Sequence, residues 1–196
     1  MTRLGRRLLS IAALALLLAT LGFPRPRSMA AKPAANPEAG DPPLLDLAGY
    51  KDMLAGYHGK GVLVTFWATW CEPCRNEYPM IISLAKEYGP QGLAVVGISL
   101  DEDADMNLVR HFLAQSHPGF PNFRQKPGID ADAFYRGVNP EWRGAMPETV
   151  FYARDGHLAR SFVGEKSKEA FVDAIRLILV SAAARLIPNN NSIAGE

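Results

Sequence analysis

The sequence has little cysteine, little histidine and almost no net charge, and each shortage excludes a class of function. Its 196 residues include two cysteines and four histidines. A structural zinc site needs four ligands. The sequence has neither a second Cys-x-x-Cys pair nor a His-x-x-x-His pair that could complete such a set, so we predict no metal site. The formal net charge of +1, with no basic stripe in the body of the chain, gives no electrostatic support for nucleic-acid binding. Internal repeats are also lacking.

One long apolar run is present, close to the N-terminus. A basic start and the apolar segment Leu8–Phe23 precede a small-residue site at Ser28–Ala30, a pattern typical of an export signal. The run is short for a membrane span, which needs about 20 residues, but Arg25 and Arg27 before the expected cleavage site are unusual for a cleaved signal. Residues 1–30 are therefore predicted to be a signal peptide or an uncleaved membrane anchor. Both alternatives place the body outside the cytoplasm, where thiols can stay oxidised.

The remaining chain divides into three parts by composition. Residues 31–43 are rich in Pro and Ala and predict a linker, because they offer little apolar surface to bury. Residues 44–187 carry the strand and helix patterns of one folded domain. Residues 188–196 are predicted to be a flexible tail.

The folded domain shows strands and helices in a mixed order. The patterns predict buried strands at Gly61–Thr69 and Gly92–Leu100, helices at Glu72–Tyr88, Asp103–Gln115 and Ile129–Phe134, hairpin strands at Thr149–Ala153 and Leu158–Val163, and a helix capped by Ser167 that runs to Ile187. The first strand–helix–strand unit favours a parallel strand pair. We therefore predict an α/β fold with a mixed central sheet and helices on both faces.

Both cysteines lie in the segment FWATWCEPCRNEYP, Phe66–Pro79. A metal half-site, a structural disulfide and a reversible redox pair are the alternatives. A disulfide between Cys71 and Cys74 would close a loop too small to constrain the unfolded chain much, and the metal reading lacks further ligands, so we favour the redox pair. Cys71 begins the predicted helix, where free N–H groups and the helix dipole favour a thiolate. Cys71 is the predicted nucleophile, and Cys74 is the predicted resolving thiol.

Two acidic residues and a proline accompany the cysteines. Glu77 follows Cys74 by three residues, so it lies on the same helix face. If Glu77 is buried there, its pKa should rise and it could accept the proton of Cys74; the alternative is an ordinary exposed glutamate. Glu72 is expected to be exposed and to tune the potential through its charge. Pro79 is expected inside the helix, where it should cause a kink.

A second proline begins the hairpin region. Pro147 follows Met146 and precedes the first hairpin strand. An X-Pro bond in such a turn can be cis, which would present the backbone of Met146 to an extended substrate. The alternative is an ordinary proline at the edge of a sheet.

Three segments resemble the extracytoplasmic thioredoxin-like proteins of the TlpA/ResA/DsbE group. They are FWATWCEPC with Glu77 and Pro79, GISLDEDADMNLVRHFL, and GAMPETVFYARDGHLARSFVGE, and the likeness covers most of Gly61–Ile187. The resemblance implies a thioredoxin fold with Pro147 as a cis-proline near the cysteines. It further implies a reductant that needs no cofactor beyond its redox-active disulfide. The implied partners are a membrane electron donor of the DsbD/CcdA type and oxidised proteins such as apocytochromes c or copper-site assembly proteins.

The sequence also departs from this family. Thr65 stands where cytoplasmic thioredoxin has a buried aspartate, which leaves Glu77 as the nearby acid that we nominate. The segment Asn139–Gly144 is a substitution or small insertion beside the proline loop, and Leu44–Gly61 matches the extra strands of the family only loosely.

The sequence therefore predicts an extracytoplasmic thiol–disulfide oxidoreductase that acts mainly as a reductase. A dithiol oxidase or isomerase is one alternative, because direction depends on reduction potential. A copper metallochaperone is another, with both thiolates and a histidine as ligands. The residues expected to contact substrate are Trp70, Glu72, Pro73, Met146 and Pro147, and the candidate third copper ligands are His111, His117 and His157.

Overall fold

The computed structural model describes residues 40–180. The predicted signal peptide or anchor at 1–30, the predicted tail at 188–196 and most of the predicted linker lie outside the described residues. Within the described part, no helix has both the length and the apolar character that a membrane crossing requires.

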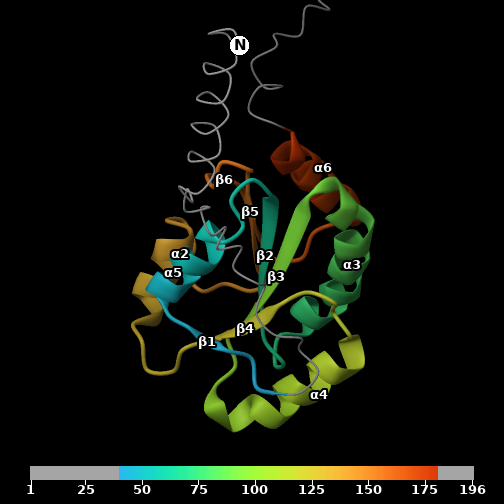
Figure 1. The fold of residues 1–196 in the computed structure, drawn as a ribbon. Helices are drawn as coiled ribbons and strands as arrows, with labels where there is room; N and C mark the ends of the chain where they lie inside the picture. The colour runs from blue at the N-terminus through green and yellow to red at the C-terminus, as the bar shows by residue number, and fades with distance from the viewer. Residues whose placement is uncertain (1–39, 181–196) are drawn as a thin grey trace, which may run out of the picture. The chain divides into compact units, whose positions relative to one another are not determined.

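Six strands form one mixed sheet in the order β1-β4-β3-β2-β5-β6 (Figure 1). The strands are β1 (Leu44–Leu45), β2 (Gly61–Trp67), β3 (Leu93–Ser99), β4 (Asn122–Gln125), β5 (Glu148–Tyr152) and β6 (Leu158–Val163). The neighbouring pairs β1–β4, β4–β3 and β3–β2 are parallel. The pairs β2–β5 and β5–β6, at the other edge, are antiparallel. The mixed sheet predicted from the sequence is confirmed.

Helices cover both faces of this sheet. They are α2 (Leu47–Ala55), α3 (Glu72–Tyr88), α4 (Met106–Ser116), α5 (Ala131–Val138) and α6 (Lys168–Leu179), with short 3-10 turns at Gly89–Gln91 and Asp103–Asp105. Helices α3, α4 and α6 contribute to one hydrophobic cluster, and α2 and α5 contribute to a second cluster on the opposite face (Figure 1). β2 divides the two clusters, because Leu63 and Trp67 face the first and Val64 and Phe66 face the second. Burial on both faces explains its continuous apolar sequence.

The longest predicted elements are confirmed, but several others differ. β2 and β3 pair in parallel, and α3 continues through Pro79 as expected. α6 begins after its predicted cap Ser167 and ends at Leu179, where Val180 adopts an extended conformation. The remainder of the predicted helix, to Ile187, lies outside the described residues.

Three elements near the sheet edge were not predicted. β1 and β4 contain two and four residues, which is too short to show a period. The segment before β2 contains the helix α2 rather than only extra strands, and the Asp46 side chain caps it by accepting the Gly49 N–H at 2.9 Å.

A glycine in β3 allows a buried polar contact behind α3. The Asn122 side-chain oxygen accepts hydrogen bonds from the Tyr78 hydroxyl at 2.8 Å and from the Trp67 indole at 3.2 Å. A Cβ atom on Gly97 would collide with that oxygen. Because Asn122 is buried and held by both partners, it has little freedom to move away.

We therefore expect Gly97→Ala to lower the free energy of unfolding by about 2 kcal/mol through overpacking. Urea denaturation would measure this loss. Gly89→Ala is the matched control, since nothing lies within 4 Å of its added Cβ, and its effect should stay within about 1 kcal/mol. Equal losses in the two variants would contradict the packing explanation.

Candidate active site

The two cysteines lie where β2 leads into α3. Cys71 is the N-cap residue of α3, with an extended backbone conformation, and its sulfur accepts the Cys74 N–H at 3.3 Å. Cys71 and Cys74 form a disulfide with 5.3 Å between their Cα atoms. The close pair at the start of a helix is therefore present as predicted. In the reduced protein the same N–H group would face the Cys71 thiolate.

Both sulfurs are nearly covered in this oxidised form. Cys71 is 5 % exposed and Cys74 is 3 % exposed, and both belong to the hydrophobic cluster on the α3 face. Trp70, immediately before Cys71, is 62 % exposed. Glu72 is exposed as expected, and Pro73 is half-buried. Trp70 and the first turn of α3 therefore form the exposed surface next to Cys71.

Pro147 lies at the same end of the sheet as the disulfide. The Met146–Pro147 peptide bond is cis. Glu148 pairs with Phe66 in the antiparallel β5–β2 register, so the residue before Glu148 lies beside the end of β2, from which the chain continues to Cys71. The Pro147 carbonyl accepts the Gly164 N–H at 2.8 Å. The half-buried Met146 packs against both hydrophobic clusters.

Glu77 is buried, as the catalytic hypothesis required. Only 4 % of its surface is exposed, and one of its carboxylate oxygens accepts the backbone N–H of Lys166 at 3.0 Å. Burial raises the pKa of Glu77 to about 7, although the Lys166 N–H acts in the opposite direction. The alternative of an exposed surface glutamate is therefore wrong. A carboxyl group with this pKa can release or accept a proton near neutral pH.

A second buried glutamate was missed by sequence reasoning. Glu148 directly follows Pro147, is fully buried, and accepts a hydrogen bond from the Asn139 side chain at 2.9 Å. Its other carboxylate oxygen has no hydrogen-bond partner among the described residues. Burial raises the pKa of Glu148 to about 7 as well, with the Asn139 contact opposing the rise. The only sequence signal was the position of an acid between Pro147 and the predicted strand Thr149–Ala153.

The two buried glutamates lie on opposite faces of the sheet. Glu77 belongs to α3, on the face that carries the cysteines. Glu148 is paired with Phe66, whose ring lies in the cluster of α2 and α5, and directly paired residues point to the same face. Of these two glutamates, Glu77 shares a face with the disulfide, whereas Glu148 is a buried group of the other layer.

The histidines nominated as copper ligands do not gather around the cysteines. His111 lies on α4, His117 follows that helix, and His157 lies in the turn between β5 and β6. Within residues 40–180, no group of three or more His, Cys, Asp or Glu side chains could hold a metal ion. The copper alternative thus gains no support from the described residues.

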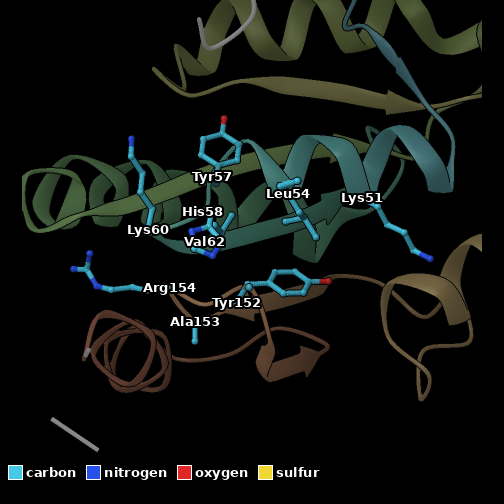
Figure 2. Close-up of a pocket in the computed structure, with 11 residues that line it drawn as sticks. Lys51, Leu54, Tyr57, His58, Lys60, Val62, Tyr152, Ala153 and Arg154 are labelled. Carbon is cyan, nitrogen blue, oxygen red and sulfur yellow. The ribbon is translucent and has the colours of Figure 1, made fainter. Parts of the chain in front are cut away.

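A pocket of about 260 Å³ is lined by residues of α2, of β2 and of the segment at the end of β5 (Figure 2). Leu54, Val62 and Tyr152 are among its lining residues, and Val62 pairs with Tyr152 near the amino end of β2, whereas Cys71 follows the carboxyl end. Arg154 also lines it, but its guanidinium donates to the carbonyls of Gly59, Gln91 and Leu179. The arginine therefore joins three backbone segments and is already occupied by these contacts.

The comparisons with known proteins identify a family and named relatives. Residues 36–161 match the AhpC/TSA family. The chain is 32 % identical over 133 residues to the thiol-disulfide oxidoreductase ResA of Bacillus thuringiensis, covering 68 % of this chain and 72 % of that protein. It is 27 % identical to ResA of Bacillus subtilis, covering 84 % and 89 %.

A solved structure shows the same fold. It is a thiol:disulfide interchange protein of the thioredoxin family from Chlorobium tepidum, with a TM-score of 0.55, 26 % identity, and coverage of 64 % of this chain and 84 % of that one. The architecture, the close Cys71–Cys74 pair and the relatives point to one assignment. The chain belongs to the AhpC/TSA family, within the thioredoxin superfamily, and is a thiol–disulfide oxidoreductase of the ResA/DsbE type.

Proposed function

We propose that this oxidoreductase reduces disulfides of other proteins outside the cytoplasm, with Cys71 as nucleophile and Cys74 as resolving thiol. The observation that carries this mechanism is the burial of Glu77, one helical turn beyond Cys74 and on the same helix face. This location supports a role in the step that Cys74 performs.

The proposed reaction has two exchanges. The Cys71 thiolate attacks one sulfur of the substrate disulfide, forms a mixed disulfide, and releases the other substrate sulfur as a thiolate. The Cys74 thiol then loses its proton to the Glu77 carboxylate and attacks the sulfur of Cys71. This attack forms the Cys71–Cys74 disulfide and releases the second substrate sulfur. Two electrons have then passed to the substrate, and the protein is oxidised.

The surroundings of the sulfurs bear on the direction of electron transfer. An oxidant arises when the reduced form is strongly stabilised, as by a thiolate of very low pKa. The start of α3 favours a thiolate at Cys71, which acts in that direction. A negative charge at Glu77 would disfavour a thiolate at either cysteine, which destabilises the reduced form and acts toward a reductant. We infer that the second effect prevails, because the family resemblance favours a reductase.

The compartment and partners are part of the same proposal. The basic and apolar N-terminal pattern and the family resemblance support an extracytoplasmic location, by export or by an N-terminal anchor. There the oxidised protein would need a thiol donor in the membrane, of the DsbD/CcdA type, to be reduced again. Apocytochromes c and copper-site assembly proteins are the substrate classes that the resemblance favours.

The reduction potential tests the direction. Equilibration of the purified protein in dithiothreitol redox buffers, with alkylation and gel shift as readout, should give a value below about −230 mV, on the reducing side of protein disulfide isomerase. A value above about −180 mV would contradict a reductase and favour a dithiol oxidase or isomerase.

A further inference from the structure

A buried aspartate lies at the end of the neighbouring strand and contacts the turn before Cys71. Asp101 follows β3, and only 2 % of its surface is exposed. Its carboxylate accepts the Thr69 N–H at 3.0 and 3.1 Å, the Thr69 hydroxyl at 2.6 Å and the Ser99 hydroxyl at 2.7 Å. All of these donors are uncharged. A carboxylate buried among neutral donors is costly unless the contacts are well formed, so the turn and the aspartate fix each other.

The backbone of Asp101 is itself anchored. The guanidinium of the buried Arg124, on β4, donates to the Asp101 carbonyl at 3.4 Å and to the Asp103 carboxylate at 2.6 Å. The Asp101 N–H also donates to the Ser99 hydroxyl at 3.0 Å. The carboxylate is thus held by two strands of the sheet and has little freedom to follow a moving turn.

Contacts continue from Thr69 to the nucleophile. The Thr69 carbonyl accepts a hydrogen bond from the Arg75 side chain at 2.8 Å. Thr69 is therefore held through its N–H, by Asp101, and through its carbonyl, by Arg75. Two residues later, the Cys71 N–H donates to the Ala68 carbonyl at 3.1 Å. The turn at residues 68–70 therefore determines where Cys71 sits relative to the first N–H groups of α3.

We propose that Asp101 is a positioning residue for disulfide exchange. Its carboxylate holds the turn at residues 68–70 so that the Cys71 sulfur stays at the N-cap of α3, where it faces the Cys74 N–H. In the reduced protein this contact stabilises the Cys71 thiolate. The inference rests on the proposed role of Cys71 as nucleophile, and it is independent of the direction in which electrons flow.

Positioning and simple charge make opposite predictions for an Asp101 variant. A carboxylate near a thiol disfavours the thiolate, so loss of that charge alone would lower the pKa of Cys71. Loss of positioning would instead raise this pKa, because the thiolate would lose its contact with the helix start. Asp101→Asn keeps the size of the side chain but replaces one acceptor with a donor, which cannot accept from Thr69 or Ser99.

The test uses a chain with a single thiol. In Cys74→Ser, Cys71 is the only cysteine, so the alkylation rate with iodoacetamide against pH reports its pKa. Adding Asp101→Asn or Thr69→Val should raise this pKa by about one unit and slow alkylation at pH 6 about tenfold. Thr69→Val removes one hydroxyl donor and no charge. Adding Asp173→Asn, an equal charge change on the exposed face of α6, should leave the rate within about twofold.

Each outcome decides the question. A lower Cys71 pKa in Asp101→Asn, with no change in Thr69→Val, would overturn positioning in favour of charge. If the Cys71 pKa is unchanged in both Asp101→Asn and Thr69→Val, Asp101 has a structural role only, even if the melting temperature falls. If Asp101→Asn does not fold, Thr69→Val still tests the proposal, and Thr69→Ser should lie closer to the parent because it keeps the hydroxyl. An ordinary thiol pKa in the Cys74→Ser parent would instead contradict the proposed nucleophile.

Discussion

Cys71→Ser is expected to abolish disulfide reduction, with a loss of at least about 10³-fold, because it removes the atom that forms the mixed disulfide. Serine cannot replace this sulfur in disulfide exchange, and the fold should tolerate the change since the two side chains are similar in size. The measurement is the initial rate of insulin reduction, followed by turbidity, with dithiothreitol as electron source. Full activity in this variant would remove Cys71 from the mechanism.

Cys74→Ser should give the complementary result. The first exchange still occurs, but without the resolving thiol the mixed disulfide through Cys71 persists. Non-reducing gels of cell envelopes from the native organism should show covalent adducts that dithiothreitol releases, and mass spectrometry of the adducts would identify substrates. The double variant Cys71→Ser/Cys74→Ser is the control and should show none. Adducts in that control, or their absence in Cys74→Ser, would contradict the assigned roles.

Glu77→Gln should slow the resolving step by about 10²-fold, a typical contribution of a general base. The reaction of the reduced protein with Ellman's reagent separates the two steps, because Cys71 releases the first thionitrobenzoate and Cys74 releases the second. In the wild type, the second phase should accelerate as pH rises through about 7, where Glu77 loses its proton. In Glu77→Gln this acceleration near pH 7 should disappear, while the first phase keeps its rate. A second phase with unchanged rate and pH profile would remove Glu77 from the reaction.

Glu148→Gln is the matched control for that experiment. It makes the same change at a buried glutamate with the same pKa of about 7, but on the opposite face of the sheet. The second phase should therefore stay as in the wild type. If Glu148→Gln slows the second phase as much as Glu77→Gln does, loss of buried charge and not the location of Glu77 would explain both effects.

Glu148→Gln should act on stability instead. Burial raises the Glu148 pKa from 4.5 to about 7 in the folded protein, so the folded state binds a proton more tightly than the unfolded state. The contribution of Glu148 to the free energy of unfolding is therefore fully present below about pH 4.5, and it is lost as the pH rises to about 7. Glu148→Gln should reduce this fall by about 2 kcal/mol, measured by urea denaturation at pH 5 and pH 8.

Local sequence patterns were sufficient for the part of the fold that carries the cysteines. β2, α3 and β3 are long and strongly patterned, and their predicted bounds differ from the observed ones by at most two residues. The Cys-x-x-Cys spacing, the position of Cys71 at the start of a helix and the proline before β5 were equally visible. Each of these features depends on neighbours within a few residues along the chain, which is why one sequence could reveal them.

Other features depended on residues that are distant in the sequence. The four residues of β4 form a strand because they pair with β3 and β1, and no periodicity can appear in so short a segment. α6 ends at Leu179, although its apolar pattern continues along the sequence into residues that the structure does not describe.

The same limit applies to the buried acids. The sequence by itself determined the fold class, the redox pair and the helix that presents it. Only the tertiary structure decided that Glu77 contacts Lys166, that Glu148 faces the other layer, and that Asp101 contacts Thr69. The physical reason is that the burial and hydrogen-bond partners of an acidic side chain are set by contacts across the sheet, which local spacing does not encode.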